Sequence, residues 1–237
     1  MKKLSTCILC DRSLEDSQRI LIRNIPESAQ GFSKKKDKLK RNFSTFLFQC
    51  KYCNHIQLST NPVEYYKEVV RSVGISKEMK NYRKKQFEDI RKDYFNNSKK
   101  VKVLEIGSAS GEYSEILSHI FEKVIATEKG EANIKKNTEK GVHCVNTHPD
   151  EPDFEKKLNK FGKFDLICCF SYLEHLPNPK KTLLSLNNFL NEDGFYLIEL
   201  PNSEMIFRRG LLNEVIPDHL SYFTINSSTT MMSKASI

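Results

Sequence analysis

The chain lacks any stretch of about 18 uncharged apolar residues, the length that a membrane-spanning helix requires. It also lacks the apolar segment of a signal peptide, because Asp11 and Arg12 follow soon after the two N-terminal lysines. These absences lead us to expect a cytoplasmic protein with no membrane partner. Hydrophobic residues nevertheless make up 38% of the 237 residues, which is enough to bury a substantial core.

The seven cysteines are an odd number, which argues against a complete disulfide framework. Two C-x-x-C pairs offer four thiolates, the tetrahedral sulfur set that Zn²⁺ prefers. The predicted metal ligands are Cys7, Cys10, Cys50 and Cys53. Because sulfur would fill all four positions, we predict a structural zinc with no catalytic role; paired buried cysteines or a redox site are the alternatives. The other three, Cys144, Cys168 and Cys169, lie in strand-like runs and are interpreted as core residues.

The formal net charge of +8 is concentrated in a basic run at residues 34–41. Such a run can bind phosphate backbones or acidic lipids. Here it lacks the interleaved aromatic side chains that stack on bases, so we interpret it as a solvated loop. Nucleic-acid binding through a zinc module stays an alternative function, but we do not expect nucleic acid as the main partner.

A short apolar run at residues 101–106 predicts a buried parallel strand. Gly107 and Gly111 end the run and precede a helical pattern, so we expect a tight loop whose backbone N–H groups approach a ligand. A dinucleotide-binding loop carries a third glycine, and this loop has Ala109 and Glu112 where that pattern needs glycine. The sequence therefore argues against hydride transfer from a dinucleotide. A plain glycine turn is the alternative.

The segment Glu105-Ile-Gly107-Ser-Ala-Ser-Gly111 resembles motif I of the class I S-adenosylmethionine-dependent methyltransferases. The resemblance implies that S-adenosyl-L-methionine is the cofactor. It also implies that Glu105 helps to place the methionine end, beside Gly107, Ser108 and Gly111. The next apolar run ends at Glu128, 21 residues after the first glycine, close to the spacing of about 20 at which a carboxylate accepts the ribose hydroxyls.

Apolar runs at residues 101–106, 123–128, 142–146, 164–170 and 195–200 alternate with helical patterns. Alternating strands and helices predict an α/β fold with a doubly wound, mostly parallel, Rossmann-like sheet. Residues 164–177 also resemble motif IV and the following segment of small-molecule methyltransferases. That resemblance places Phe170 and His175 at the carboxyl end of the central strand, and it makes Asp150, after the third strand, a candidate for the adenine contact.

Near the C-terminus, Asp218, His219 and Phe223 resemble the acidic-His-x-x-x-Phe element of sugar C-methyltransferases, which also carry a four-cysteine zinc module. The resemblance implies that His219, assisted by Asp218, removes a proton next to a ketone, with His175 as the second candidate base. The predicted activity is methyl transfer to a small-molecule acceptor, by C-methylation of a nucleotide-linked ketosugar. O-methylation and an inactive binding protein are the alternatives.

We expect three regions: a zinc module at residues 1–60, a helical linker or lid at 61–98 and a methyltransferase domain at 99–237. Helices are predicted after Pro62, from Ser76 to about Asn96 and from Lys181 to Leu190. The last two antiparallel strands of the family's sheet have no counterpart in the sequence. A truncated sheet of five strands with an exposed edge is therefore expected.

Overall fold

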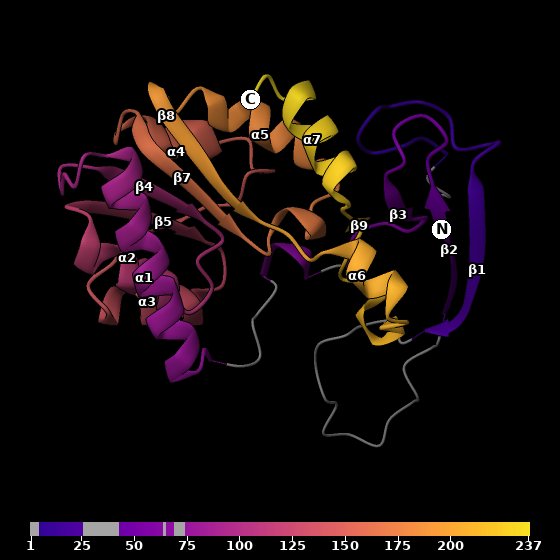
Figure 1. The fold of residues 1–237 in the computed structure, drawn as a ribbon, viewed down its shortest axis with the longest axis horizontal. Coiled ribbons are helices and arrows are strands. Elements are labelled where there is room, and N and C mark those ends of the chain that lie inside the picture. The colour runs from indigo at the N-terminus through magenta and orange to yellow at the C-terminus, as the bar shows by residue number, and fades with distance from the viewer. Residues whose placement is uncertain (1–4, 26–42, 64, 69–73) are drawn as a thin grey trace. The chain divides into compact units, whose positions relative to one another are not determined.

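The computed structural model describes residues 5–25, 43–63, 65–68 and 74–237. Contacts divide the chain into two compact units, which we describe separately (Figure 1). The parallel-sheet unit comprises Lys67–Phe170 and Ser185–Glu199, and the composite unit comprises Met1–Tyr66, Ser171–Leu184 and Leu200–Ile237. The domain boundaries expected after residues 60 and 98 stay predictions. The basic run at residues 34–41 lies outside the described residues.

The parallel-sheet unit is built on five parallel strands in the order β6-β5-β4-β7-β8. These strands are β4 (Lys102–Ile106), β5 (Lys123–Glu128), β6 (His143–Asn146), β7 (Phe164–Phe170) and β8 (Leu190–Glu199). Figure 1 shows helices beside this sheet. The α/β prediction and its parallel Rossmann-like sheet are confirmed, and β8 forms one edge of the sheet as described.

In the described part of the chain, five helices accompany the parallel strands, and the first two pack apolar side chains against the sheet. They are α1 (Lys77–Tyr94), α2 (Glu112–Ile120), α3 (Glu131–Glu139), α4 (Phe154–Asn159) and α5 (Pro179–Asn187), the last of which passes between the units. Phe87 of α1 and Leu117 of α2 pack with Val103, Leu166 and Cys168 in one buried cluster. Successive residues of a strand point to opposite faces of the sheet. Because both faces are covered, the residues on either face are buried.

The last strand of the parallel sheet begins earlier than predicted. We expected a helix to Leu190 and a strand from Phe195, but β8 starts at Leu190 and runs through Gly194. Leu190 pairs with Phe164, and the Asn191 amide donates a 2.6 Å hydrogen bond to the Asp165 carboxylate. These partners lie on β7, so the pairing that extends β8 depends on residues distant in the sequence.

The composite unit contains an antiparallel sheet that the sequence analysis did not predict. Its strands, in the order β1-β2-β3-β9, are β1 (Gln18–Ile25), β2 (Phe43–Gln49), β3 (Ile56–Leu58) and β9 (Ser221–Tyr222). Short helices complete this unit: η2 (Leu173–His175), α6 (Ser203–Arg208), η3 (Leu212–Glu214) and α7 (Ile225–Lys234). The turn η1 (Tyr66–Glu68) has Tyr66 in this unit and its other two residues in the parallel-sheet unit. The sheet therefore joins the N-terminal segment to a strand from near the C-terminus.

The helix predicted after Pro62 appears in the described residues only as the 3₁₀ turn η1. Residues 69–73, which were expected to continue it, lie outside the described part of the chain. The predicted second helix is confirmed as α1, capped by the Ser76 side chain. Among the described residues, no helix is both long enough and apolar enough to cross a membrane.

Candidate cofactor, metal and catalytic sites

The loop after β4 turns sharply through left-handed backbone conformations. Gly107 and Gly111 have φ angles of +71° and +79°, and Ala109 between them has a φ of +47°. A Cβ atom on Gly111 would lie 2.6 Å from the Asn137 side-chain oxygen. Glycine is therefore required at position 111 both for its backbone conformation and for the space beside it.

We expected the backbone N–H groups of this loop to approach a ligand. Instead, they donate hydrogen bonds within the protein. The Gly107 and Ser108 amides donate to the Thr127 carbonyl oxygen at 3.1 and 3.0 Å, and the Ala109 amide donates to the Glu128 carboxylate at 2.9 Å. The Gly111 amide donates to the Ser108 carbonyl oxygen at 2.9 Å. The loop is thus preorganised against β5, and its glycines provide close approach rather than donors for a ligand.

Two side chains of the segment around α3 hold the loop from the other side. The buried Asn137 amide donates to the carbonyl oxygens of Ala109 at 2.7 Å and Asn133 at 2.9 Å. The Lys140 ammonium donates to the Ser110 carbonyl oxygen at 2.8 Å. The sequence analysis missed both residues, because an asparagine and a lysine in a polar helix look like solvated surface positions.

Glu128 ends β5 beside the loop and is only 6% exposed. One carboxylate oxygen accepts from Ala109, and the other accepts from the Gly130 amide at 2.9 Å. Burial raises the pKa of the Glu128 carboxyl, and the backbone donors Gly130, Lys129 and Ala109 oppose that rise. The Asn133 side chain also lowers this pKa, so the carboxylate is held in place by donors from the loop and from the start of α3.

Three other predicted cofactor residues lie at or near strand ends of the same unit. Glu105 of β4 is buried and accepts a hydrogen bond from the Ser114 hydroxyl of α2. Phe170, the last residue of β7, packs against the rings of Phe87 and Tyr113. Asp150 lies in the turn after β6, where its backbone N–H donates to the His148 ring at 3.1 Å. Their predicted contacts with the cofactor stay predictions.

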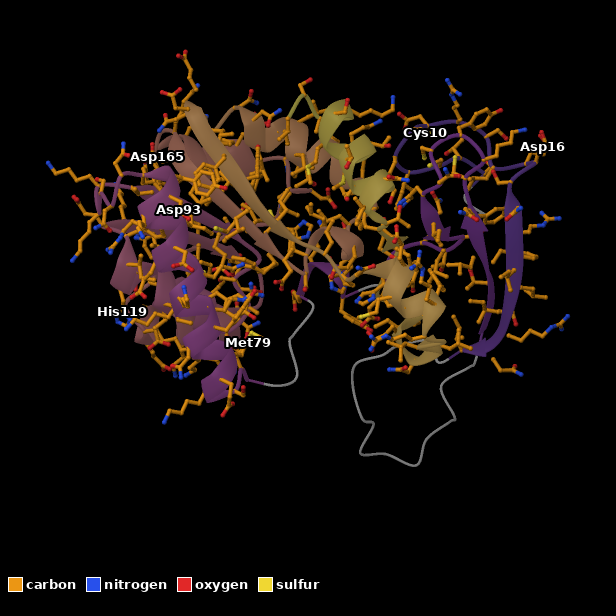
Figure 2. The ribbon with its side chains drawn as sticks, in the orientation of Figure 1. Cys10, Asp16, Met79, Asp93, His119 and Asp165 are labelled. Carbon is orange, nitrogen blue, oxygen red and sulfur yellow. The ribbon has the colours of Figure 1, made fainter. Side chains whose placement is uncertain are left out.

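The four predicted zinc ligands meet in the composite unit. The Sγ atoms of Cys7 and Cys53 lie 3.6 Å apart, as do those of Cys10 and Cys50, and all four sulfur atoms lie within 4.8 Å of one another. Sulfur atoms about 2.3 Å from a tetrahedral zinc are separated by about 3.8 Å, so this arrangement fits the ion. Figure 2 labels Cys10.

The predicted catalytic residues also meet in the composite unit, but with different pairings. The Asp218 carboxylate is buried and accepts a 2.6 Å hydrogen bond from the Tyr65 hydroxyl. The His219 ring lies beside the His175 ring, with 4.8 Å between the centroids. The carboxylate near this histidine pair is Glu174, whose Oε1 lies 3.9 Å from the His175 Nε2. Sequence reasoning had paired His219 with Asp218 and had given Glu174 no role.

Burial disfavours the protonated form of both histidines. Burial, and to a smaller extent the nearby His175, lower the pKa of His219 to about 4, while a bond to the Glu214 backbone opposes the change. Burial likewise lowers the pKa of His175, against the effect of its hydrogen bond to the Asp218 backbone. A neutral imidazole has one unprotonated nitrogen, so each ring can accept a proton or bind a metal ion.

Comparison with known proteins gives a family for this geometry. A family model described as a methyltransferase domain matches residues 79–235. C-methyltransferase NovU from Streptomyces niveus is 20% identical over 129 residues, which cover 54% of this chain and 31% of that protein. A ubiquinone biosynthesis O-methyltransferase from Glaesserella parasuis is 42% identical over 52 residues, which cover 21% of this chain and 22% of that protein.

The solved structures agree on the fold. The YcgJ protein from Bacillus subtilis superposes with a TM-score of 0.51 at 17% identity, covering 65% of this chain and 68% of that one. At this identity the likeness concerns the fold alone. The chain spans less than a third of the length of either curated relative that it matches.

Proposed function

The chain belongs to the methyltransferase-domain family, and from that premise we propose that it transfers a methyl group from S-adenosyl-L-methionine to a small molecule. One observation carries the proposal. A tight loop with glycines at both ends lies directly beside a buried carboxylate at the end of the neighbouring strand, and the two are joined by the Ala109–Glu128 hydrogen bond. This arrangement suits a nucleoside, whose ribose hydroxyls need acceptors and which approaches a loop of glycines and small residues closely.

S-adenosylmethionine, when bound, supplies a methyl group on a sulfonium with a neutral leaving group. The protein's own contribution is to align the acceptor and to expose its nucleophilic atom. We assign Glu128 to the ribose, Gly107, Ser108 and Gly111 to close approach, and Asp150 to the adenine amino group. Glu105 is assigned to the methionine end of the cofactor. Phe170, the last residue of β7, is assigned to a contact with the cofactor.

We propose that the acceptor is a carbon next to a ketone, as in a nucleotide-linked ketosugar. The proposal is supported by the neutral histidine pair and by the similarity to a protein named as a C-methyltransferase. His219 takes the proton from the C–H bond, and His175 is the second candidate base. The Tyr65 hydroxyl holds the Asp218 carboxylate, and the Asp218 backbone in turn orients His175.

We further infer a structural zinc on Cys7, Cys10, Cys50 and Cys53. The 3.6 Å sulfur separations support it, and a filled S₄ site gives the ion no open position for chemistry. The zinc would instead connect the first turn of the chain to the turn between β2 and β3.

Hydrogen exchange into the acceptor tests the proposed base directly. The protein is incubated in D₂O with a nucleotide-linked 4-ketosugar and S-adenosylhomocysteine, and deuterium next to the ketone is measured by mass spectrometry. We expect wild type to speed exchange and His219→Gln to slow it at least tenfold, because deprotonation precedes methyl transfer. His119→Gln, which changes an exposed histidine of α2, is the matched control.

Exchange that is equal in wild type and His219→Gln would contradict the role of His219 as the base, and a wild-type protein that does not speed exchange would contradict the C-methylation proposal. Methylation of a hydroxyl acceptor without any exchange at carbon would instead support O-methylation, with the same histidine accepting the O–H proton. These outcomes leave the cofactor proposal to be judged separately, by binding of S-adenosylhomocysteine.

A further inference from the structure

Three side chains with metal-ligating atoms converge in the composite unit, apart from the four cysteines. Glu174, His175 and His219 each offer one such atom, and these atoms all lie within 4.8 Å of one another. Glu174 is 1% exposed, and it follows Leu173 in the turn η2. We propose that these three residues form a second, distinct binding site for a divalent transition-metal ion.

The hydrogen bonds around the two histidines are those of metal ligands. The Nδ1 atom of His175 lies 2.7 Å from the Asp218 carbonyl oxygen, which can only accept, so Nδ1 carries the proton. The other nitrogen, Nε2, is then unprotonated and lies 3.9 Å from the Glu174 carboxylate. The His219 ring also bonds to a backbone group, at Glu214. Backbone carbonyls that fix the tautomer in this way orient metal-binding histidines in many proteins.

The position of Glu174 is itself held by the chain. The backbone N–H of Leu220, the residue after His219, donates a 2.8 Å hydrogen bond to the Glu174 carbonyl oxygen. The segments that carry the three ligands, residues 174–175 and 219, are therefore joined by one backbone hydrogen bond at Glu174 and by the bond from the His175 ring to the Asp218 carbonyl oxygen. A site built in this way needs only side-chain adjustment to close on an ion.

The donor set selects the class of ion. Two imidazole nitrogens and one carboxylate favour Zn²⁺ or a neighbouring first-row ion over Mg²⁺ or Ca²⁺, which prefer oxygen ligands. An ion about 2.1 Å from each donor requires donors about 3.4 Å apart, so the present separations must shrink by about 1.4 Å at most. Three protein ligands leave one position open for water or an oxygen of an acceptor.

The buried Asp218 carboxylate, next to these ligands, already accepts a hydrogen bond from the Tyr65 hydroxyl. We therefore propose that Asp218 supports the site and does not bind the ion. An ion on His219 occupies the lone pair that would accept a proton. This part of the inference rests on the proposed function, and it means that metal ions compete with the proposed base and inhibit exchange at carbon.

Binding of Co²⁺ to the full chain tests the site without any methyl acceptor. The protein is first loaded with one equivalent of zinc, which the four thiolates prefer, and is then titrated with Co²⁺ while visible absorption is followed. We expect one further equivalent to bind, with d–d bands but without the intense thiolate-to-cobalt band of a sulfur site. His219→Ala and Glu174→Gln should each weaken this binding by about tenfold or more.

His119→Ala is the matched control, because His119 is an exposed histidine of the other unit (labelled in Figure 2). Circular dichroism and zinc content show whether each variant is folded. The inference is overturned if folded wild type binds no second equivalent. It is also overturned if the Co²⁺ spectrum shows sulfur ligation, or if His119→Ala weakens binding as much as His219→Ala does. Failure of the ketosugar exchange experiment alone leaves the metal site standing, because Co²⁺ binding is measured without substrate.

Discussion

The two units of this molecule are stabilised in different ways. In the parallel-sheet unit, four of the five residues of β4 are buried, and β4 lies at the centre of the sheet between β5 and β7. In the composite unit, most of β1 is exposed, and the sheet is completed by a two-residue strand from near the C-terminus. The parallel-sheet unit has one apolar cluster between its helices and strands, whereas the composite unit joins distant segments through a smaller apolar cluster of Leu47, Leu58, Val215 and Tyr222 and through its cysteine cluster.

This difference predicts which changes should damage which unit. The parallel-sheet unit should keep its fold without a metal ion, because its strands are covered by apolar helices. The N-terminal part of the composite unit should depend more on zinc, because the cysteine cluster joins the turn at residues 7–10 to the turn after β2. The two units also carry different parts of the proposed chemistry: the cofactor loop in one and the candidate base in the other.

Loss of zinc should produce the largest difference in stability between the two units. We expect Cys50→Ser to remove about one equivalent of zinc and to unfold the N-terminal part of the composite unit, since structural zinc in small modules is worth about 10 kcal/mol. Hydrogen exchange read by mass spectrometry should show lost protection in β1 to β3 and retained protection in β4 to β7. Cys144→Ser, on β6 of the other unit, is the control and should keep its zinc. Protection that is retained in β1 to β3 of a zinc-free Cys50→Ser protein would contradict the predicted dependence of this region on zinc.

Gly111→Ala should have the next largest effect, and it should act mainly on cofactor binding. Gly111 and Gly141 have nearly equal φ angles, +79° and +77°, but only Gly111 has neighbours where a Cβ would lie. Each substitution should cost about 1 kcal/mol of unfolding free energy through the backbone. Only Gly111→Ala should also displace Asn137 and weaken S-adenosylhomocysteine binding by about tenfold or more, measured by calorimetry. Equal losses of affinity in the two variants would show that the contact with Asn137 is unimportant.

Asn137→Ala should have a smaller effect on the same loop. The substitution removes the donor to the Ala109 and Asn133 carbonyl oxygens, at a cost of about 1–3 kcal/mol in unfolding free energy. Binding of S-adenosylhomocysteine should weaken several-fold, because the loop loses its support from α3. Thr138→Ala, which changes an exposed neighbour whose hydroxyl bonds only within α3, should leave affinity unchanged. An unaltered affinity in Asn137→Ala would mean that β5 alone fixes the loop.

Local patterns were sufficient to predict the parallel-sheet unit. Each of its strands is a short apolar run, and each loop signal, such as Gly107 or the carboxylate at Glu128, lies next to the strand that positions it. The resemblance of two motifs then supplied the family, which the comparison confirmed. The start of β8 was missed because its pairing with Phe164 depends on a strand distant in the sequence.

The composite unit could be predicted only in part, because its structure depends on contacts across most of the chain. The pairing of Ile56 with Tyr222 joins segments that share no local pattern. Spacing alone indicated the cysteine cluster, since two C-x-x-C pairs specify their own geometry. No spacing indicates that Tyr65 bonds to Asp218 or that Glu174 lies beside His175, so the surroundings of the candidate base emerged only from the structure.

The most direct test of the central claim is calorimetric titration of the folded, zinc-loaded chain with S-adenosylhomocysteine. Glu128→Ala removes the proposed ribose acceptor, and Glu131→Ala, an exposed glutamate at the start of α3, is the matched control. We predict one binding site per chain, with affinity reduced tenfold or more in Glu128→Ala and unchanged in Glu131→Ala. A folded wild-type protein that does not bind S-adenosylhomocysteine would contradict the proposal that this chain is an S-adenosylmethionine-dependent methyltransferase.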